Sequence, residues 1–195
     1  MFNKRYLYLG LLVISILTAS CSPNESSEDY SYVKADESIK GLSNFITKSK
    51  PIVIKTCNEF KSYHPNATRA FVQEDSLDIY ARNIANETEL FLVENQVSTD
   101  SIGNEYKLQV LSTLGLALIE QERNSSTNQT RSIGGCAAYA IGIRDILKRG
   151  LTSKAGLRFA VKTLTKNIAK KAIPYVGWGL TFGEFAYCMY HDGDV

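Results

Sequence analysis

The stretch KAGLRFAVKTLTKNIAKKAIPYVGWGLTFGEFAYCMY, residues 154–190, decides the fold class of this chain. In residues 154–171, apolar side chains recur at helical spacing, at Leu157, Val161, Leu164 and Ile168. Basic side chains recur every four residues around the rest of the same helix: Lys154, Arg158, Lys162, Lys166 and Lys170. This pattern predicts a basic amphipathic helix of the kind that lies on anionic lipid.

Residues 172–190 hold a single charge, Glu184, and predict a second helix that begins at Pro174. One face of that helix is aromatic and apolar, with Tyr175, Trp178, Phe182, Phe185 and Met189. Gly179 and Gly183 form a notch of small residues on another face. As a helix the stretch would be about 28 Å long, close to the hydrocarbon thickness of a bilayer. Two interpretations stay open: a helix buried in a protein core, and a membrane-active hairpin whose Trp178 and Phe182 enter lipid.

The earlier part of the chain is also periodic at helical spacing and shows no sustained alternation of the strand type. A proline, Pro51, is expected to start a new helix after the stripe that ends at Ile46. Another helix is expected to begin near Asn104, and one more within 134–150, with Gly150 as its stop. The sequence therefore predicts an all-α protein: a small helical bundle with a basic, aromatic C-terminal helical unit.

Charge divides the chain into two halves. Residues 22–130 hold ten Lys/Arg and sixteen Asp/Glu, a balance of −6, whereas residues 131–195 hold ten Lys/Arg and four Asp/Glu, a balance of +6. The polar stretch NSSTNQTRS separates them and indicates an exposed linker. A basic half of this kind suits an anionic partner.

The N-terminus, MFNKRYLYLGLLVISILTASC, has the order of a secretion signal. Lys4 and Arg5 give a positive start, and the uncharged, mostly apolar run 6–19 is too short to span a bilayer comfortably. Small residues then lead to Cys21. The expected segments are a signal peptide at 1–20, an acidic tether at 21–33, an acidic helical region at 34–123, a polar linker at 124–134 and a basic helical unit at 135–195.

The motif LTASC, residues 17–21, resembles the lipobox of bacterial lipoproteins. In that family a peptidase cuts before the cysteine, and the cysteine thiol is acylated. The resemblance implies cleavage between Ser20 and Cys21 and a lipid on Cys21; with Ser22 rather than aspartate next, it also implies the outer membrane, facing the periplasm or the surface. The alternative is an ordinary secreted protein in which Cys21 has no such role.

Once Cys21 is set aside, the cysteine count is odd, with Cys57, Cys136 and Cys188 remaining. Disulfides persist outside the inner membrane. Because Cys136 and Cys188 lie in the same C-terminal unit, we predict that they pair and that Cys57 stays unpaired. The alternative is three buried free thiols.

A second resemblance concerns SIGGC, residues 132–136, which is similar to the double-glycine site where class II bacteriocin leaders are cut. A cationic, aromatic sequence with two cysteines follows it, as in many such peptides. The resemblance implies a cut after Gly135 that would release a membrane-active peptide beginning at Cys136.

Two short motifs, DSL and DSI, resemble the O-glycosylation sequon of one phylum of Gram-negative bacteria. The resemblance makes Ser76 and Ser101 candidate acceptors.

The sequence carries no phosphate-binding loop, HExxH or GxSxG motif, and His191 with Cys188 falls short of a metal-ligand set. We therefore expect no catalysis, cofactor, metal or nucleic-acid partner. The expected function is a lipid-anchored cell-envelope protein with a structural or binding role, whose partner is an envelope protein, a polyanion or anionic lipid. The alternative is a precursor or carrier of the bacteriocin-like C-terminal peptide.

Overall fold

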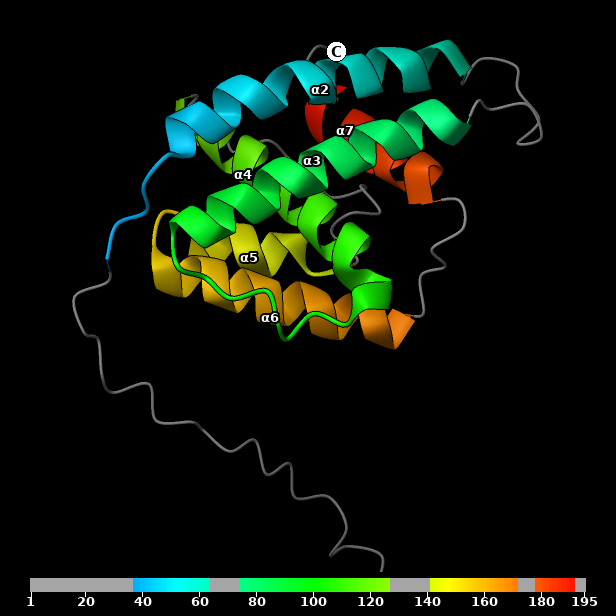
Figure 1. The fold of residues 1–195 in the computed structure, drawn as a ribbon. Coiled ribbons are helices and arrows are strands. Elements are labelled where there is room, and N and C mark those ends of the chain that lie inside the picture. The colour runs from blue at the N-terminus through cyan, green and yellow to red at the C-terminus, as the bar shows by residue number, and fades with distance from the viewer. Residues whose placement is uncertain (1–36, 64–73, 127–140, 172–177, 192–195) are drawn as a thin grey trace, which may run out of the picture. The chain divides into compact units, whose positions relative to one another are not determined.

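The computed structural model of the chain, drawn in Figure 1, describes residues 37–63, 74–126, 141–171 and 178–191. These residues form six α-helices and a 3-10 turn, without a strand among them. In chain order they are α2 (Leu42–Tyr63), α3 (Glu74–Glu94), η2 (Asn104–Tyr106), α4 (Lys107–Ser126), α5 (Ile143–Arg149), α6 (Lys154–Lys171) and α7 (Trp178–His191). The predicted all-α helical bundle is confirmed.

Helix α4 is the centre of the bundle. It packs against α2, α3, α5, α6 and α7, and every residue from Gln109 to Glu120 is buried. Its polar side chains are accommodated within this core: the Ser112 hydroxyl donates to the Leu108 carbonyl at 2.7 Å, one turn earlier in the helix. Gly115 lets α3 approach closely, since a Cβ there would lie 2.5 Å from side-chain atoms of Ile84 and Thr88.

Helix α7 packs against α2 and α3 and completes the core. The Gly179–Gly183 notch is where α3 and α2 approach it: a Cβ on Gly179 would lie 2.6 Å from the Asp78 amide nitrogen, and one on Gly183 would lie 2.8 Å from the Phe60 ring. The Phe60 and Tyr187 rings also meet, with centroids 5.7 Å apart. The predicted start at Pro174 lies outside the described residues.

The acidic and basic segments share one hydrophobic core, which includes Phe45 and Leu114 as well as Leu164 and Trp178. All described helices belong to one compact unit. Helix α4 continues to Ser126, so the first three residues of the expected 124–134 linker are helical, and the remaining ones lie outside the described residues. The boundary between the acidic and the basic part of the sequence therefore does not divide the hydrophobic core.

One helix start differs from the sequence prediction: α2 runs unbroken through Pro51 instead of restarting there. The helix expected within 134–150 is α5, which begins at Ile143 after Gly142, whose φ of +94° is left-handed. Residues 134–140 of that prediction lie outside the described residues. The predicted stop at Gly150 is confirmed, since its φ is +85° and its N–H donates to the carbonyls of Ile146 and Leu147.

Residues 37–41, which precede α2, contact the residue that follows α3 and the residues at the start of α6. We call them the entry segment. The Asn95 side chain accepts from the Lys40 N–H at 2.7 Å and donates to the Lys40 carbonyl at 3.1 Å. On the other side, the Lys154 N–H donates to the Glu37 carbonyl at 3.2 Å, and Ser38 forms an isolated β-bridge with Ser153. The entry segment thus lies between the end of α3 and the start of α6.

No described helix has both the length and the apolar character needed to cross a bilayer. The predicted signal peptide at 1–20 lies outside the described residues.

Candidate functional site

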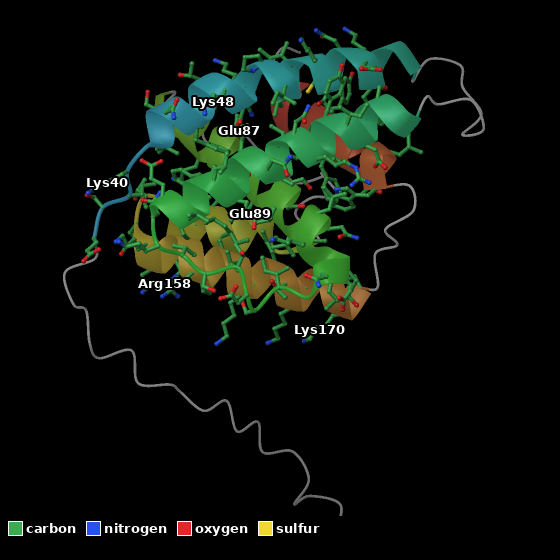
Figure 2. The ribbon with its side chains drawn as sticks, viewed as in Figure 1. Lys40, Lys48, Glu87, Glu89, Arg158 and Lys170 are labelled. Atoms are coloured by element: carbon green, nitrogen blue, oxygen red, sulfur yellow. The ribbon has the colours of Figure 1, made fainter. Side chains whose placement is uncertain are left out.

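The most distinctive surface is the outer face of α6, and we call its four cations, Arg158, Lys162, Lys166 and Lys170, the α6 basic face. All four side chains are exposed. Figure 2 shows Arg158 and Lys170 projecting from α6 away from the other helices. They stand twelve residues apart on the helix, which corresponds to about 18 Å along its axis.

The opposite side of α6 explains why these cations face outward. Leu157, Val161, Leu164 and Ile168 are all buried, and α6 packs against α4, α5 and η2. The predicted amphipathic helix is confirmed, including its bounds at Lys154 and Lys171. At its start, Gly156 lies so close to the preceding turn that a Cβ would be 2.2 Å from the Gly150 carbonyl oxygen.

The α6 basic face has no ion pair among the described residues. Other cations of the bundle do have acidic partners: Lys48 lies 3.5 Å from Glu87, and Lys107 lies 2.5 Å from Glu89. The positive charge of the α6 basic face is therefore left uncompensated by the described protein, even though this domain has acidic residues elsewhere.

Helix α5, which packs against α6, also has exposed basic side chains. The Arg149 guanidinium lies over the Phe159 ring of α6, 4.4 Å from its centroid, a cation–π contact that joins the two helices. Arg144 and Lys148 are exposed on α5 as well. Residues 141–171 contain nine Lys/Arg and a single acidic residue, Asp145. Exposed cations are therefore present on both of these adjacent helices.

Lys154 belongs to a different environment from the other predicted contact residues. Its ammonium pairs with the Glu37 carboxylate, and its side chain is only 17% exposed. It also donates to the Gln96 side-chain oxygen at 3.4 Å. Lys154 thus anchors the entry segment, which corrects its assignment to the anion-binding surface.

Trp178 and Phe182 are fully buried, which corrects their assignment as membrane contacts in the folded chain. The Trp178 indole N–H donates to the Ser112 hydroxyl at 3.0 Å, and its ring meets Phe185 edge-on with centroids 5.9 Å apart. Of the two interpretations of this helix, the structure shows the core element.

The remaining predicted site residues are the cysteines and the two candidate glycosylation serines. Cys188 on α7 is disulfide-bonded and Cys57 is a free thiol. Cys136, the predicted partner, and Cys21, the predicted lipid site, lie outside the described residues, so both assignments stay predictions. Ser76 donates its hydroxyl to the Glu59 carboxylate, whereas Ser101 is exposed in the turn before η2.

A buried polar cluster at the end of α4 was missed from the sequence. Arg123 lies 2.9 Å from the Glu120 carboxylate, which is 2% exposed, and donates to the Met189 carbonyl near the end of α7 at 2.6 Å. Nearby, burial raises the pKa of the Cys57 thiol to about 12, although Arg123 opposes this shift. The hydrogen bond from Arg123 to Met189 stabilises the contact between α4 and α7. The raised pKa disfavours a reactive thiolate at Cys57.

No protein-family model, curated protein or solved structure matches this chain. The described residues also contain no group of three or more His, Cys, Asp or Glu side chains able to hold a metal ion. The candidate site therefore depends on geometry alone.

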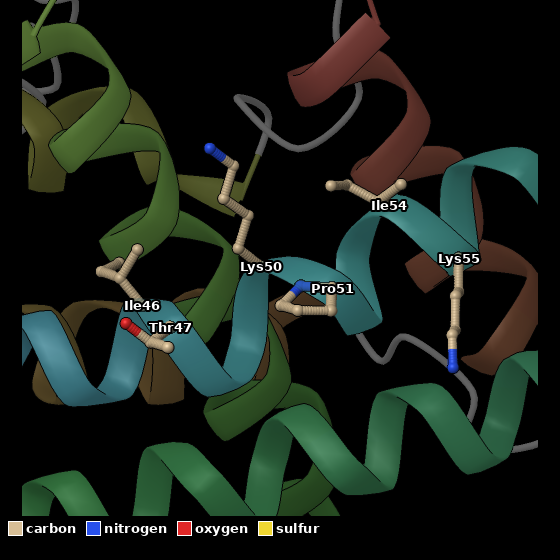
Figure 3. Close-up of a pocket in the computed structure, with 6 residues that line it drawn as sticks. All are labelled: Ile46, Thr47, Lys50, Pro51, Ile54 and Lys55. Carbon is tan, nitrogen blue, oxygen red and sulfur yellow. The ribbon is translucent and has the colours of Figure 1, made fainter.

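A shallow apolar hollow on α2 is a weaker candidate, and Figure 3 shows its lining: Ile46, Thr47, Lys50, Pro51, Ile54 and Lys55. All of these residues come from one helix. The Lys50 and Lys55 side chains point in different directions, so their ammonium groups do not converge on one anion. The α6 basic face is the stronger candidate because its cations share one exposed side of a helix.

Proposed function

We propose that this chain is a lipid-anchored cell-envelope protein with a non-catalytic binding role, and that its α6 basic face binds an anionic partner. The observation that carries the proposal is that four exposed cations on one helix face have no ion pair within the described residues.

The energetics of α6 support a binding role. Like charges four residues apart destabilise a helix by about 0.2–0.5 kcal/mol per pair, and the α6 basic face contains three such pairs in succession. Burial of Leu157, Val161, Leu164 and Ile168 offsets this cost. An anionic partner would remove the mutual repulsion of the exposed cations.

The location is proposed from the N-terminal sequence. A lipid on Cys21 would hold the protein at the outer membrane, on the periplasmic or the surface side. A disulfide between Cys136 and Cys188 suits that oxidising setting.

The bacteriocin-like alternative is less favoured by the packing. A released peptide from Cys136 onward would have to withdraw α7 from α2, α3 and α4, which would expose Trp178 and Phe182. Each large aromatic side chain contributes roughly 1.5–3 kcal/mol through burial, so this withdrawal would be costly for the domain left behind.

The binding role is tested with two full-length variants that lose the same charge. In the first, Arg158, Lys162, Lys166 and Lys170 are all replaced by Gln. In the matched control, four exposed lysines outside this face, Lys40, Lys50, Lys55 and Lys61, are replaced by Gln. We expect the first variant to elute from immobilised polyphosphate at clearly lower salt than the control. Equal elution of the two variants would show that net charge, and not this face, governs binding.

The anchor is tested separately by Cys21→Ala. We expect this variant to leave the membrane fraction or to keep its signal peptide. A variant that stays on the membrane with a cut signal would contradict the lipoprotein assignment.

A further inference from the structure

We infer that the anionic partner of the α6 basic face is the phosphate headgroup layer of the same membrane that holds the lipid on Cys21. This inference rests on the proposed function and specifies its ligand as a lipid surface. Three features of the described residues carry it: the spread of the cations, their connection to α5, and the position of the entry segment.

The cations are spread over a surface instead of a line. Successive residues of the α6 basic face are four positions apart, and each step turns them by about 40° around the helix axis. From Arg158 to Lys170 the cations therefore cover about a third of the helix circumference. A helix that lies on a flat layer of phosphates can use such an arc, because long basic side chains bend toward the layer from both flanks.

Helix α5, which packs against α6, adds further exposed cations. The Arg149 guanidinium lies over the Phe159 ring of α6, and Arg144 and Lys148 are exposed on α5. A linear polyanion would engage one row of cations, whereas a headgroup layer can engage cations on both helices together. Each basic residue near an anionic bilayer contributes about 1 kcal/mol, which corresponds to about fivefold in partition per residue.

The entry segment begins at Glu37, which lies beside the start of α6. Glu37 pairs with Lys154, the first residue of α6, and the Lys154 N–H donates to the Glu37 carbonyl. Only residues 22–36 separate Cys21 from Glu37, a length that cannot exceed about 58 Å even when fully extended. An anchored domain is thus confined near the bilayer, where the local concentration of headgroups is high.

The lipid on Cys21 and the basic patch would then attach the protein to one membrane at two places. The surface contact would add an orientation that the lipid alone cannot impose: α6 against the membrane and α2, at the opposite side of the bundle in Figure 1, away from it.

The test uses lipidated full-length protein purified from its native membrane and placed in vesicles. One set contains phosphatidylcholine only, and the other contains phosphatidylcholine with phosphatidylglycerol. An amine-acylating reagent is added, and the labelling rate of each lysine is measured by mass spectrometry. Lys162, Lys166 and Lys170 report on α6, while Lys50, Lys55 and Lys61 on α2 serve as controls within the same molecule.

We expect the α6 lysines to be labelled several-fold more slowly in the anionic vesicles, and the α2 lysines to be unaffected. This protection should disappear in molar salt, where the Debye length falls to about 3 Å. Equal labelling of α6 in both vesicle types would overturn the inference and leave the anchor intact. Failure of the protein to enter either vesicle type would instead contradict the anchor.

A third arm adds soluble polyphosphate to protein in neutral vesicles. Protection of the α6 lysines by polyphosphate but not by phosphatidylglycerol would overturn the membrane as partner, although the proposed binding role would stand. The variant with all four α6 cations replaced by Gln, placed in anionic vesicles, should label its α5 residue Lys148 faster than the unaltered protein does.

Discussion

Gly179 is a residue at which α3 and α7 come close together. A methyl group there would lie 2.6 Å from the Asp78 amide nitrogen and 3.0 Å from the Leu77 carbonyl carbon, and both are backbone atoms that cannot move aside cheaply. We expect Gly179→Ala to lower the free energy of unfolding by about 1–3 kcal/mol, measured by urea denaturation followed by circular dichroism.

Gly103→Ala is the matched control, because a methyl group there meets only the flexible side chain of Glu105 and its φ of −57° suits alanine. An unchanged midpoint for Gly179→Ala would mean that α3 and α7 are not in this close contact.

Cys57 gives a prediction about pH. Burial raises the pKa of its thiol from the usual 9.0 to about 12. Above pH 9 the unfolded chain loses the thiol proton while the folded chain keeps it, so this contribution to stability is complete below pH 9 and declines between pH 9 and 12. We expect the free energy of unfolding to fall less steeply over this range in Cys57→Ala than in the unaltered protein. Parallel pH profiles would refute a buried neutral thiol.

At the scale of the element, α2 carries a proline that it does not need for packing, since Pro51 is exposed. Proline within a helix removes one backbone hydrogen bond and costs about 3 kcal/mol relative to alanine, while it also restricts the unfolded chain by up to about 1 kcal/mol. Pro51→Ala should therefore raise the free energy of unfolding by about 1–2 kcal/mol in a denaturant titration. Lys55→Ala, on the same exposed side, is the control for the gain in helix propensity. If Pro51→Ala stabilises the protein no more than Lys55→Ala does, Pro51 does not strain α2.

The elements differ in how well their sequences predict them. Helix α6 was predicted with its bounds because one helix holds both its apolar stripe and its cations. The path of α2 through Pro51 was not, because packing of Phe45 and Val53 into one core outweighs the local preference for a break. Likewise, the left-handed Gly142 and the Asn95 contact with Lys40 depend on residues far apart in the chain.

The candidate site, too, could be predicted from the sequence only in part. Exposure of Arg158, Lys162, Lys166 and Lys170 follows from the helical period, so it could be predicted. The pairing of Lys154 with Glu37 joins residues 117 positions apart and could not. Trp178 and Phe182 could face either a core or a lipid, because both are apolar surroundings for the same side chains.

At the scale of the whole molecule, Trp178 is a single probe, since the chain contains one tryptophan. It is fully buried at the contact of α7 with α4. We expect blue-shifted emission from the intact protein, little quenching by iodide, and no response to anionic vesicles. On urea denaturation the emission should shift red together with the loss of helical circular dichroism. A native spectrum typical of exposed tryptophan, or one that shifts on addition of vesicles, would contradict the shared core.

The place of α7 in the bundle has a consequence for biosynthesis. Ribosomes make α2, α3 and α4 before α7, yet all three pack against α7. Until that helix emerges, Leu77 and the Phe60 ring lack their neighbours on its side, and the nascent chain has no complete core to close. The final folding step is therefore expected to wait for α7.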